Sequence, residues 1–108
     1  MSGKNENRPE RAGLAERRQK AKGRIRRIAG QVAGIERMIN EERYCVDILN
    51  QIAAVRSALD GLGVELLHQH LEGCVLGHGS GSEHEAARPM SQDALLDELQ
   101  TALNRFLR

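Results

Sequence analysis

Residues 44–76 have the sequence YCVDILNQIAAVRSALDGLGVELLHQHLEGCVL, and the fold class can be predicted from them. Its apolar residues recur at spacings of three and four, which is the period of one face of an α-helix. The members of this stripe are Ile48, Leu49, Ile52, Val55, Leu59, Leu62, Leu66, Leu67, Leu71 and Val75. The pattern predicts one long helix that starts near Tyr44 or Cys45 and ends around Leu76 and Gly77, before a flexible run at residues 78–82.

Two more helices are predicted, one on each side of this stretch. The earlier one carries an apolar stripe with the same spacing, made of Ala21, Ile25, Ile28, Val32, Ile35 and Ile39. The later one follows Pro89, with Ser91 as its N-cap and Leu95, Leu96, Leu99, Leu103 and Phe106 on its apolar face. Because no stretch alternates apolar and polar residues as a half-buried strand would, the sequence predicts an all-α fold with three helices.

The 108 residues, of which only Tyr44 and Phe106 are aromatic, allow one small domain. We expect residues 1–12 to form a disordered basic arm and residues 13–108 a single helical domain. Long helices with thin aliphatic stripes bury little surface alone, so association with further copies is expected. No apolar segment has the length of a signal peptide or a membrane span, which predicts a cytoplasmic protein whose two cysteines are thiols or metal ligands.

Charge is distributed unevenly along the chain. Residues 1–27 hold ten Lys/Arg against three Glu, a balance of +7, whereas the rest holds six basic against twelve acidic residues. A basic segment on an acidic body indicates a polyanionic partner on one face. The alternative is a solvated tail with no partner.

Cys45, His70 and Cys74 are the candidate metal ligands. His70 and Cys74 are four positions apart, so on a helix they share a face and can bind one ion together. Cys45 lies about 38 Å from His70 on the same helix, at 1.5 Å per residue, and cannot join them within one chain. It can join them if two such helices pack antiparallel in a dimer, which creates two identical sites across the interface.

Two thiolates and one imidazole form a soft set of three donors, which suits Cu(I). Zinc and square-planar Ni(II) normally need a fourth ligand. On a helix, His68 faces away from His70, and His78 and His84 fall in or beside the flexible run, so none is expected to be a primary ligand. The plainer alternative is that both cysteines are small buried apolar residues.

Four short motifs together resemble the CsoR/RcnR family of bacterial metal-sensing repressors. They are RIRRIAGQV at residues 24–32, YCVDIL at 44–49, QIAAV at 51–55 and HLEGC at 70–74. The resemblance covers roughly residues 20–76 and is weaker in the last helix. In the copper-sensing (CsoR) branch of the family, Cys, His and Cys occupy the positions of Cys45, His70 and Cys74.

The resemblance implies a dimer built as an antiparallel four-helix bundle, which pairs into a homotetramer. It also implies a repressor that binds operator DNA when metal-free and releases it on binding Cu(I). Tyr44 and Glu98 match family residues that act beside the metal ligands. We find no helix-turn-helix, so the expected DNA surface is the basic cluster Arg17, Arg18, Lys20, Lys22, Arg24, Arg26 and Arg27, with Arg56 in place of a family arginine absent near Gly61.

Three alternatives remain open. The same fold could respond to persulfide through Cys45 and Cys74, although a sulfur sensor does not need His70. It could respond to nickel, although no histidine precedes His68 to complete four ligands. It could also buffer copper without binding DNA. An enzyme with a small-molecule substrate is not expected, because no acid/base pair or nucleophile constellation is present.

Overall fold

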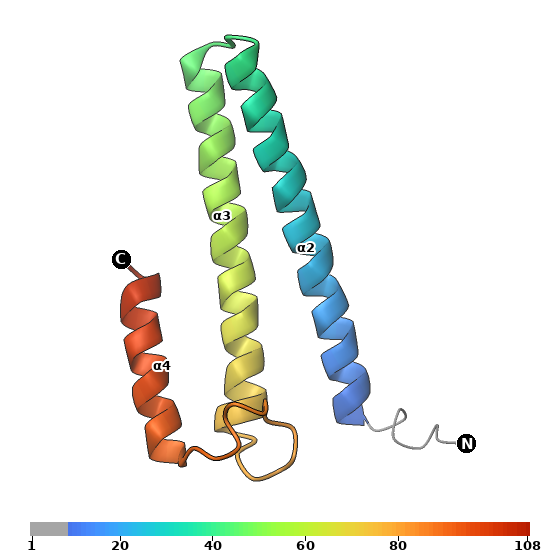
Figure 1. Ribbon diagram of the computed structural model, residues 1–108, viewed down its shortest axis with the longest axis vertical. Coiled ribbons are helices and arrows are strands. Elements are labelled where there is room, and N and C mark those ends of the chain that lie inside the picture. Colours follow the sequence, from blue (N-terminus) through green and yellow to red (C-terminus); the bar gives the residue numbers. More distant parts are fainter. Residues whose placement is uncertain (1–8) are drawn as a thin grey trace, which may run out of the picture. The chain divides into compact units, whose positions relative to one another are not determined.

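The computed structural model describes residues 9–108, and all of its regular elements in that range are helical. Helix α2 spans Pro9–Asn40, α3 spans Cys45–His70 and α4 spans Gln92–Phe106. A π-helical turn, η1, follows α3 directly and spans Leu71–Val75. The predicted all-α fold with three helices is confirmed (Figure 1).

The first helix begins earlier than the sequence predicts. Pro9 opens α2, so residues 9–12 of the predicted arm lie within the helix. Proline is well suited to the first helical position, because its fixed φ matches the helix and the N–H it lacks would have no partner there. Residues 1–8 of the predicted arm lie outside the described residues.

The chain forms two compact units, and the division falls within α3 between Leu66 and Leu67. In the first unit, α2 and α3 run antiparallel as a helical hairpin (Figure 1). The connecting turn is closed by backbone hydrogen bonds from Glu41 N to Arg37 O and from Arg43 N to Met38 O, both 2.9 Å. The Tyr44 carbonyl then accepts the N–H groups of Asp47 and Ile48, which starts α3 where the sequence predicts.

The core of the hairpin is small and comes from the predicted stripes. Ile28, Val55 and Leu62 are buried, with Ala21, Ile35 and Ala58 packed around them. Many other stripe residues remain exposed on the single chain, among them Ile25, Val32, Ile39, Leu49, Ile52, Leu59 and Leu66. Apolar side chains in such number on one hairpin form a surface that is suited to burial against another chain.

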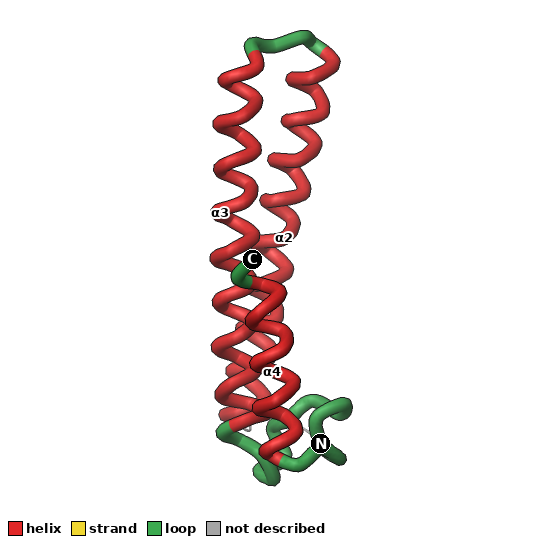
Figure 2. Tube along the Cα trace, turned by 90° about the vertical axis from the view of Figure 1, so that its left-hand side faces the viewer, coloured by secondary structure: helices red, strands yellow, loops and turns green. Residues whose placement is uncertain are grey.

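The second unit, Leu67–Arg108, is built around Leu95. This α4 residue is fully buried and packs with Cys74, Val75 and Ala87. The predicted N-cap is confirmed, because the Ser91 hydroxyl accepts the N–H of Ala94 at 3.1 Å. The helical path that starts with α3 ends in η1, whose defining bond runs from Leu76 N to Leu71 O over 2.8 Å. Figure 2 shows the long loop that follows it before α4.

None of the helices in the described part of the chain is both long enough and apolar enough to cross a membrane.

Candidate metal centre and nucleic-acid interface

Cys45 and His70 are the first and last residues of α3. Cys45 is exposed and has a free thiol. His70 is half-buried and keeps helical backbone angles, with φ −64° and ψ −43°, where α3 passes into η1. Two residues at opposite ends of a helix this long cannot bind the same ion within one chain.

Cys74 lies in η1 and is buried, with 6% of its surface exposed. A π-helical turn is wider than an α-helical one, and such turns often occur at functional sites. The pair His70 and Cys74 therefore spans the passage from α3 into η1, where the sequence predicts a plain α-helix. The Cys74 thiol is free.

No three His, Cys, Asp or Glu side chains within residues 9–108 are grouped closely enough to hold a metal ion. The expected site needs Cys45 from a second chain, so a single chain can supply only His70 and Cys74 to it. The donor types agree with a soft metal ion, because two thiolates and an imidazole are the ligands that Cu(I) favours.

The loop after η1, which contains the predicted flexible run, is held by hydrogen bonds to its own backbone and to that of η1. The Ser80 hydroxyl donates to Gly77 O at 2.6 Å, and the Ser82 hydroxyl donates to Gly73 O at 3.1 Å. His78 donates from Nε2 to the carbonyl of Met90 at 2.7 Å. The polar residues of the loop thus satisfy backbone groups of the loop itself and of η1.

His84 lies in the same loop and contacts Cys74 through its backbone. Its N–H donates to the Cys74 sulfur at 3.3 Å. Its ring atom Nδ1 accepts the N–H of Ala86 at 3.0 Å, which leaves Nε2 as the protonated nitrogen of the neutral ring. His68 lies 3.6 Å from Glu72, between Nδ1 and Oε1.

Tyr44 and Glu98 are both exposed on the single chain. Tyr44 precedes α3 directly beside Cys45, and Glu98 lies in the middle of α4. Their roles beside the metal ligands stay predictions.

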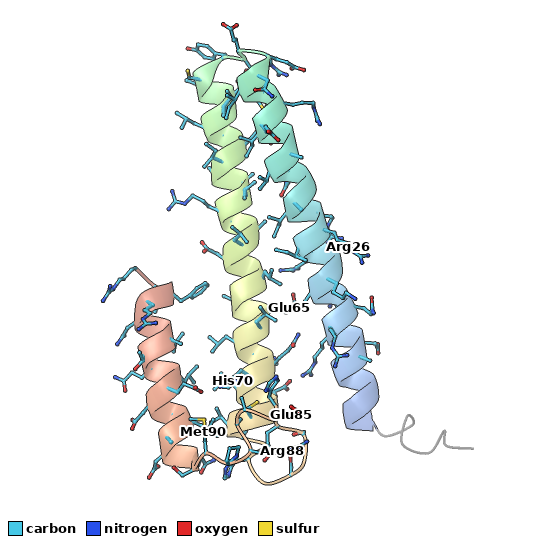
Figure 3. All side chains as sticks on the ribbon, in the orientation of Figure 1. Arg26, Glu65, His70, Glu85, Arg88 and Met90 are labelled. Carbon is cyan, nitrogen blue, oxygen red and sulfur yellow. The ribbon has the colours of Figure 1, made fainter. Side chains whose placement is uncertain are left out.

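The predicted basic cluster lies along α2. Arg18, Lys20, Lys22, Arg26 and Arg27 are exposed, whereas Arg17 and Arg24 are partly buried. Arg56 is exposed on α3. Figure 3 shows Arg26 on α2, pointing to solvent.

A groove of about 430 Å³ lies between α2 and α3 beside this cluster. Its lining is formed by Arg24, Arg27, Ile28 and Gln31 of α2 with Ser57, Ala58 and Gly61 of α3. Arg24 Nε lies 3.4 Å from Glu65 Oε1, and a Cβ at Gly61 would lie 3.1 Å from Arg24 Nη1. The Arg24 guanidinium thus occupies the space that glycine leaves free. Two guanidinium groups, an amide and a hydroxyl give the groove the chemistry of an anion site.

The sequence of residues 17–105 matches the family model of the metal-sensitive transcriptional repressors. The chain belongs to this family of metal-sensing transcription repressors, whose members are not enzymes.

Several of its relatives are described by the metal that they sense. The copper-sensing transcriptional repressor RicR of Mycobacterium tuberculosis is 42% identical over 85 residues, which cover 79% of this chain and 82% of that protein. The copper-sensing repressor CsoR of Bacillus subtilis is 50% identical over 52 residues, or 48% of this chain and 52% of that protein.

Two solved structures share the fold. The copper-sensing repressor CsoR with Cu(I) from Geobacillus thermodenitrificans superposes with a TM-score of 0.69 at 36% identity, covering 83% of this chain and 85% of the other. The nickel-responsive regulator InrS superposes with a TM-score of 0.62, also at 36% identity, covering 82% and 90%.

Three residues of these sites are absent from the sequence prediction. Glu65 forms an ion pair with the Arg24 guanidinium, and Gly61 leaves the space that this guanidinium occupies. Neither residue type, on a helix with exposed side chains, gives a sequence signal for such a role. Glu83 organises the loop beside Cys74, accepting the N–H of Gly81 at 2.8 Å. The sequence signal for this role of Glu83 is weak: one acidic residue follows a run of alternating Gly and Ser.

Proposed function

We propose that this chain is a Cu(I)-responsive transcriptional repressor, which binds operator DNA when metal-free and releases it when Cu(I) binds. The observation that carries the proposal is the placement of the donors: Cys45 begins α3, and His70 and Cys74 follow at its other end. Similarity to repressors named copper-sensing supports copper as the inducer.

The proposed working unit is a dimer in which the α3 helices pack antiparallel. The exposed apolar residues of α2 and α3 support this arrangement, because packing against a second hairpin would remove them from water. The same arrangement brings Cys45 of one chain to His70 and Cys74 of the other. Pairing of two dimers into a tetramer is part of the proposal.

Operator DNA would bind to the basic cluster of α2, with the groove at Arg24 and Arg27 receiving a backbone phosphate. Contacts of this kind release counterions, so binding should weaken steeply as salt rises. Arg56 on α3 would extend the surface.

Release requires that the metal favour a protein conformation with lower affinity for DNA. The proposed site links two chains, so ligation by Cys45 of one and His70 and Cys74 of the other constrains how the hairpins pack. A change in that packing alters the spacing of the basic clusters on the two chains. Coupling between the sites is then carried by the dimer interface.

The test is an anaerobic titration of the reduced protein with Cu(I) against a chromophoric chelator. We expect one tightly bound Cu(I) per chain in the native protein and loss of that binding in Cys74→Ala. His68→Gln is the matched control, because it removes an imidazole of α3 that is outside the proposed ligand set. Failure of the native chain to compete with the chelator would overturn the copper proposal.

Nickel is the second candidate, because the chain superposes on a nickel-responsive regulator. The same titration with Ni(II) separates the two. Tight Ni(II) binding that releases operator DNA, with no such response to Cu(I), would favour nickel. A persulfide response would require neither ion and would survive replacement of His70 by Ala.

A further inference from the structure

The loop of residues 77–91 covers the buried thiol of Cys74. The Cys74 sulfur accepts the N–H of His84 at 3.3 Å. Around it pack Val75, Ala87 and Leu95, with Leu71 and Met90 at the edge of the cluster. Figure 3 shows Met90 with Glu85 and Arg88 of the same loop. The hydrogen bond from the His84 N–H orients the Cys74 sulfur within the loop.

The Glu83 carboxylate holds the loop in this shape. Its side chain is buried, with 7% of the residue exposed, and its two oxygens accept the N–H groups of Gly79 and Gly81 at 2.5 and 2.8 Å. Both glycines have positive φ, 84° and 93°, a conformation that costs glycine little and directs their N–H groups inward. A carboxylate surrounded by N–H groups in this way closes a loop much as a bound anion would.

Two further bonds attach the loop and the start of α4 to η1. The Ser82 hydroxyl donates to Gly73 O at 3.1 Å, and the Gln92 side chain donates from Nε2 to Val75 O at 3.0 Å. Gly77 approaches η1 so closely that a Cβ there would lie 2.7 Å from Gly73 O. The loop is therefore attached to the turn that carries Cys74 on both sides of Glu83.

We propose that Glu83 is a positioning residue for Cys74. Its carboxylate holds the loop in the shape in which the His84 N–H donates to the Cys74 sulfur, and this bond orients the sulfur for binding a soft metal ion. This proposal rests on the proposed function in one respect, that Cys74 is a metal ligand. Glu83 itself does not touch the sulfur, and acts through the backbone of the next residue.

The first test measures amide hydrogen exchange at His84 in the full-length, reduced, metal-free protein. In Glu83→Gln we expect exchange at least about tenfold faster than in the native chain, because hydrogen bonds to a charged group are lost and local opening becomes easier. Glu85→Gln is the matched control, since Glu85 is an exposed acidic residue of the same loop and should leave the rate unchanged. Equal rates in the two variants would overturn the proposal.

The second test follows alkylation of Cys74 by iodoacetamide in a Cys45→Ser background. The buried thiol should react slowly, and faster once Glu83→Gln is added. Ser82→Ala, which keeps the carboxylate and removes one attachment to η1, should give a smaller increase, and circular dichroism checks that each variant keeps its helices. An alkylation rate that does not respond to Glu83→Gln contradicts the proposal.

Cu(I) titration of the same variants separates the two proposals. If Glu83→Gln changes exchange and alkylation while the native chain binds no Cu(I), the loop acts as proposed and the copper function fails. If the native chain binds Cu(I) and neither rate responds to Glu83→Gln, the copper function stands and the positioning role fails.

Discussion

Arg24 of α2 and Glu65 of α3 form an ion pair across the helical hairpin, with 3.4 Å between Arg24 Nε and Glu65 Oε1. Glu65 lies on the side of α3 that faces α2 (Figure 3). The Arg24 side chain is 42% exposed and the Glu65 side chain 20%, so the pair adds little to stability. Its consequence is geometric: the guanidinium lines the groove, with its Nη1 atom beside Gly61.

Arg24→Ala should weaken operator binding at every salt concentration. Loss of one phosphate contact should also lower the slope of log affinity against log salt by about 1. Fluorescence anisotropy with labelled operator over a potassium chloride series measures both. Arg43→Ala serves as the control, because Arg43 lies in the α2–α3 turn outside the basic cluster. Unchanged affinity would remove Arg24 from the DNA surface.

Alanine at two glycines should change stability in opposite directions. In Gly61→Ala the new Cβ meets only the flexible end of Arg24, so helix propensity dominates and we expect a gain of up to about 1 kcal/mol. In Gly77→Ala the Cβ would lie 2.7 Å from Gly73 O and 2.8 Å from Glu72 O, and backbone must move. A loss of about 1–3 kcal/mol is expected there.

Urea unfolding of the metal-free protein measures both changes. If Gly61→Ala destabilises the protein instead, the Arg24 side chain cannot move away from the new Cβ, and the prediction is wrong.

Metal binding should be restored when two defective chains are combined. Cys45→Ala and Cys74→Ala should each fail to bind Cu(I) tightly as homodimers. In a dimer with one chain of each kind, Cys45 of one and His70 and Cys74 of the other complete one site, and the second site lacks both cysteines. Differently tagged chains, co-expressed and purified over both tags, provide this sample for the chelator titration. Absence of binding in it would exclude a site shared between chains.

The stabilising effect of Glu83 should disappear in acid. The pKa of the Glu83 carboxyl is lowered from 4.5, mainly by hydrogen bonds from its own backbone N–H and from that of Gly79. Burial raises this pKa, whereas the Gly81 N–H and the charge of His78 lower it further. A carboxylate whose pKa is lower in the folded protein than in the unfolded chain stabilises the fold at pH values above its unfolded-state pKa. This stabilisation is lost as the pH falls through the folded-state pKa.

Thermal melts of the native chain and Glu83→Gln test this prediction. The native chain should melt higher at neutral pH, and the difference should shrink as the pH is taken below 4.5. A difference that stays constant down to the lowest pH would show that the Glu83 charge does not stabilise the loop.

The helices were predictable because the signals for them are local. Apolar residues at spacings of three and four located α2, α3 and α4, and Ser91 marked the start of α4. The start of α2 at Pro9 and the π-helical turn at Leu71–Val75 were not predicted. In the π-helical turn a backbone N–H bonds to the carbonyl five residues earlier instead of four. This change leaves the spacing of the apolar residues nearly unchanged, so the sequence pattern cannot reveal it.

The candidate ligands could be proposed from residue type and spacing alone, since few side chains bind a soft metal and a pair four apart shares a helix face. The environment of Cys74 could not. Its contact with His84 spans ten residues, and it depends on two glycines with positive φ and on the Glu83 carboxylate that they enclose.

The helical fold, the uneven charge and the identity of the possible donors can all be predicted without coordinates, because periodicity, composition and side-chain chemistry are properties of residues close together in the chain. The ion pair of Arg24 with Glu65 beside Gly61, and the loop of small polar residues that covers Cys74, could be found only in the folded chain. Such contacts form when the chain folds back on itself, and their geometry is set by packing and hydrogen bonding between segments that the local pattern does not relate.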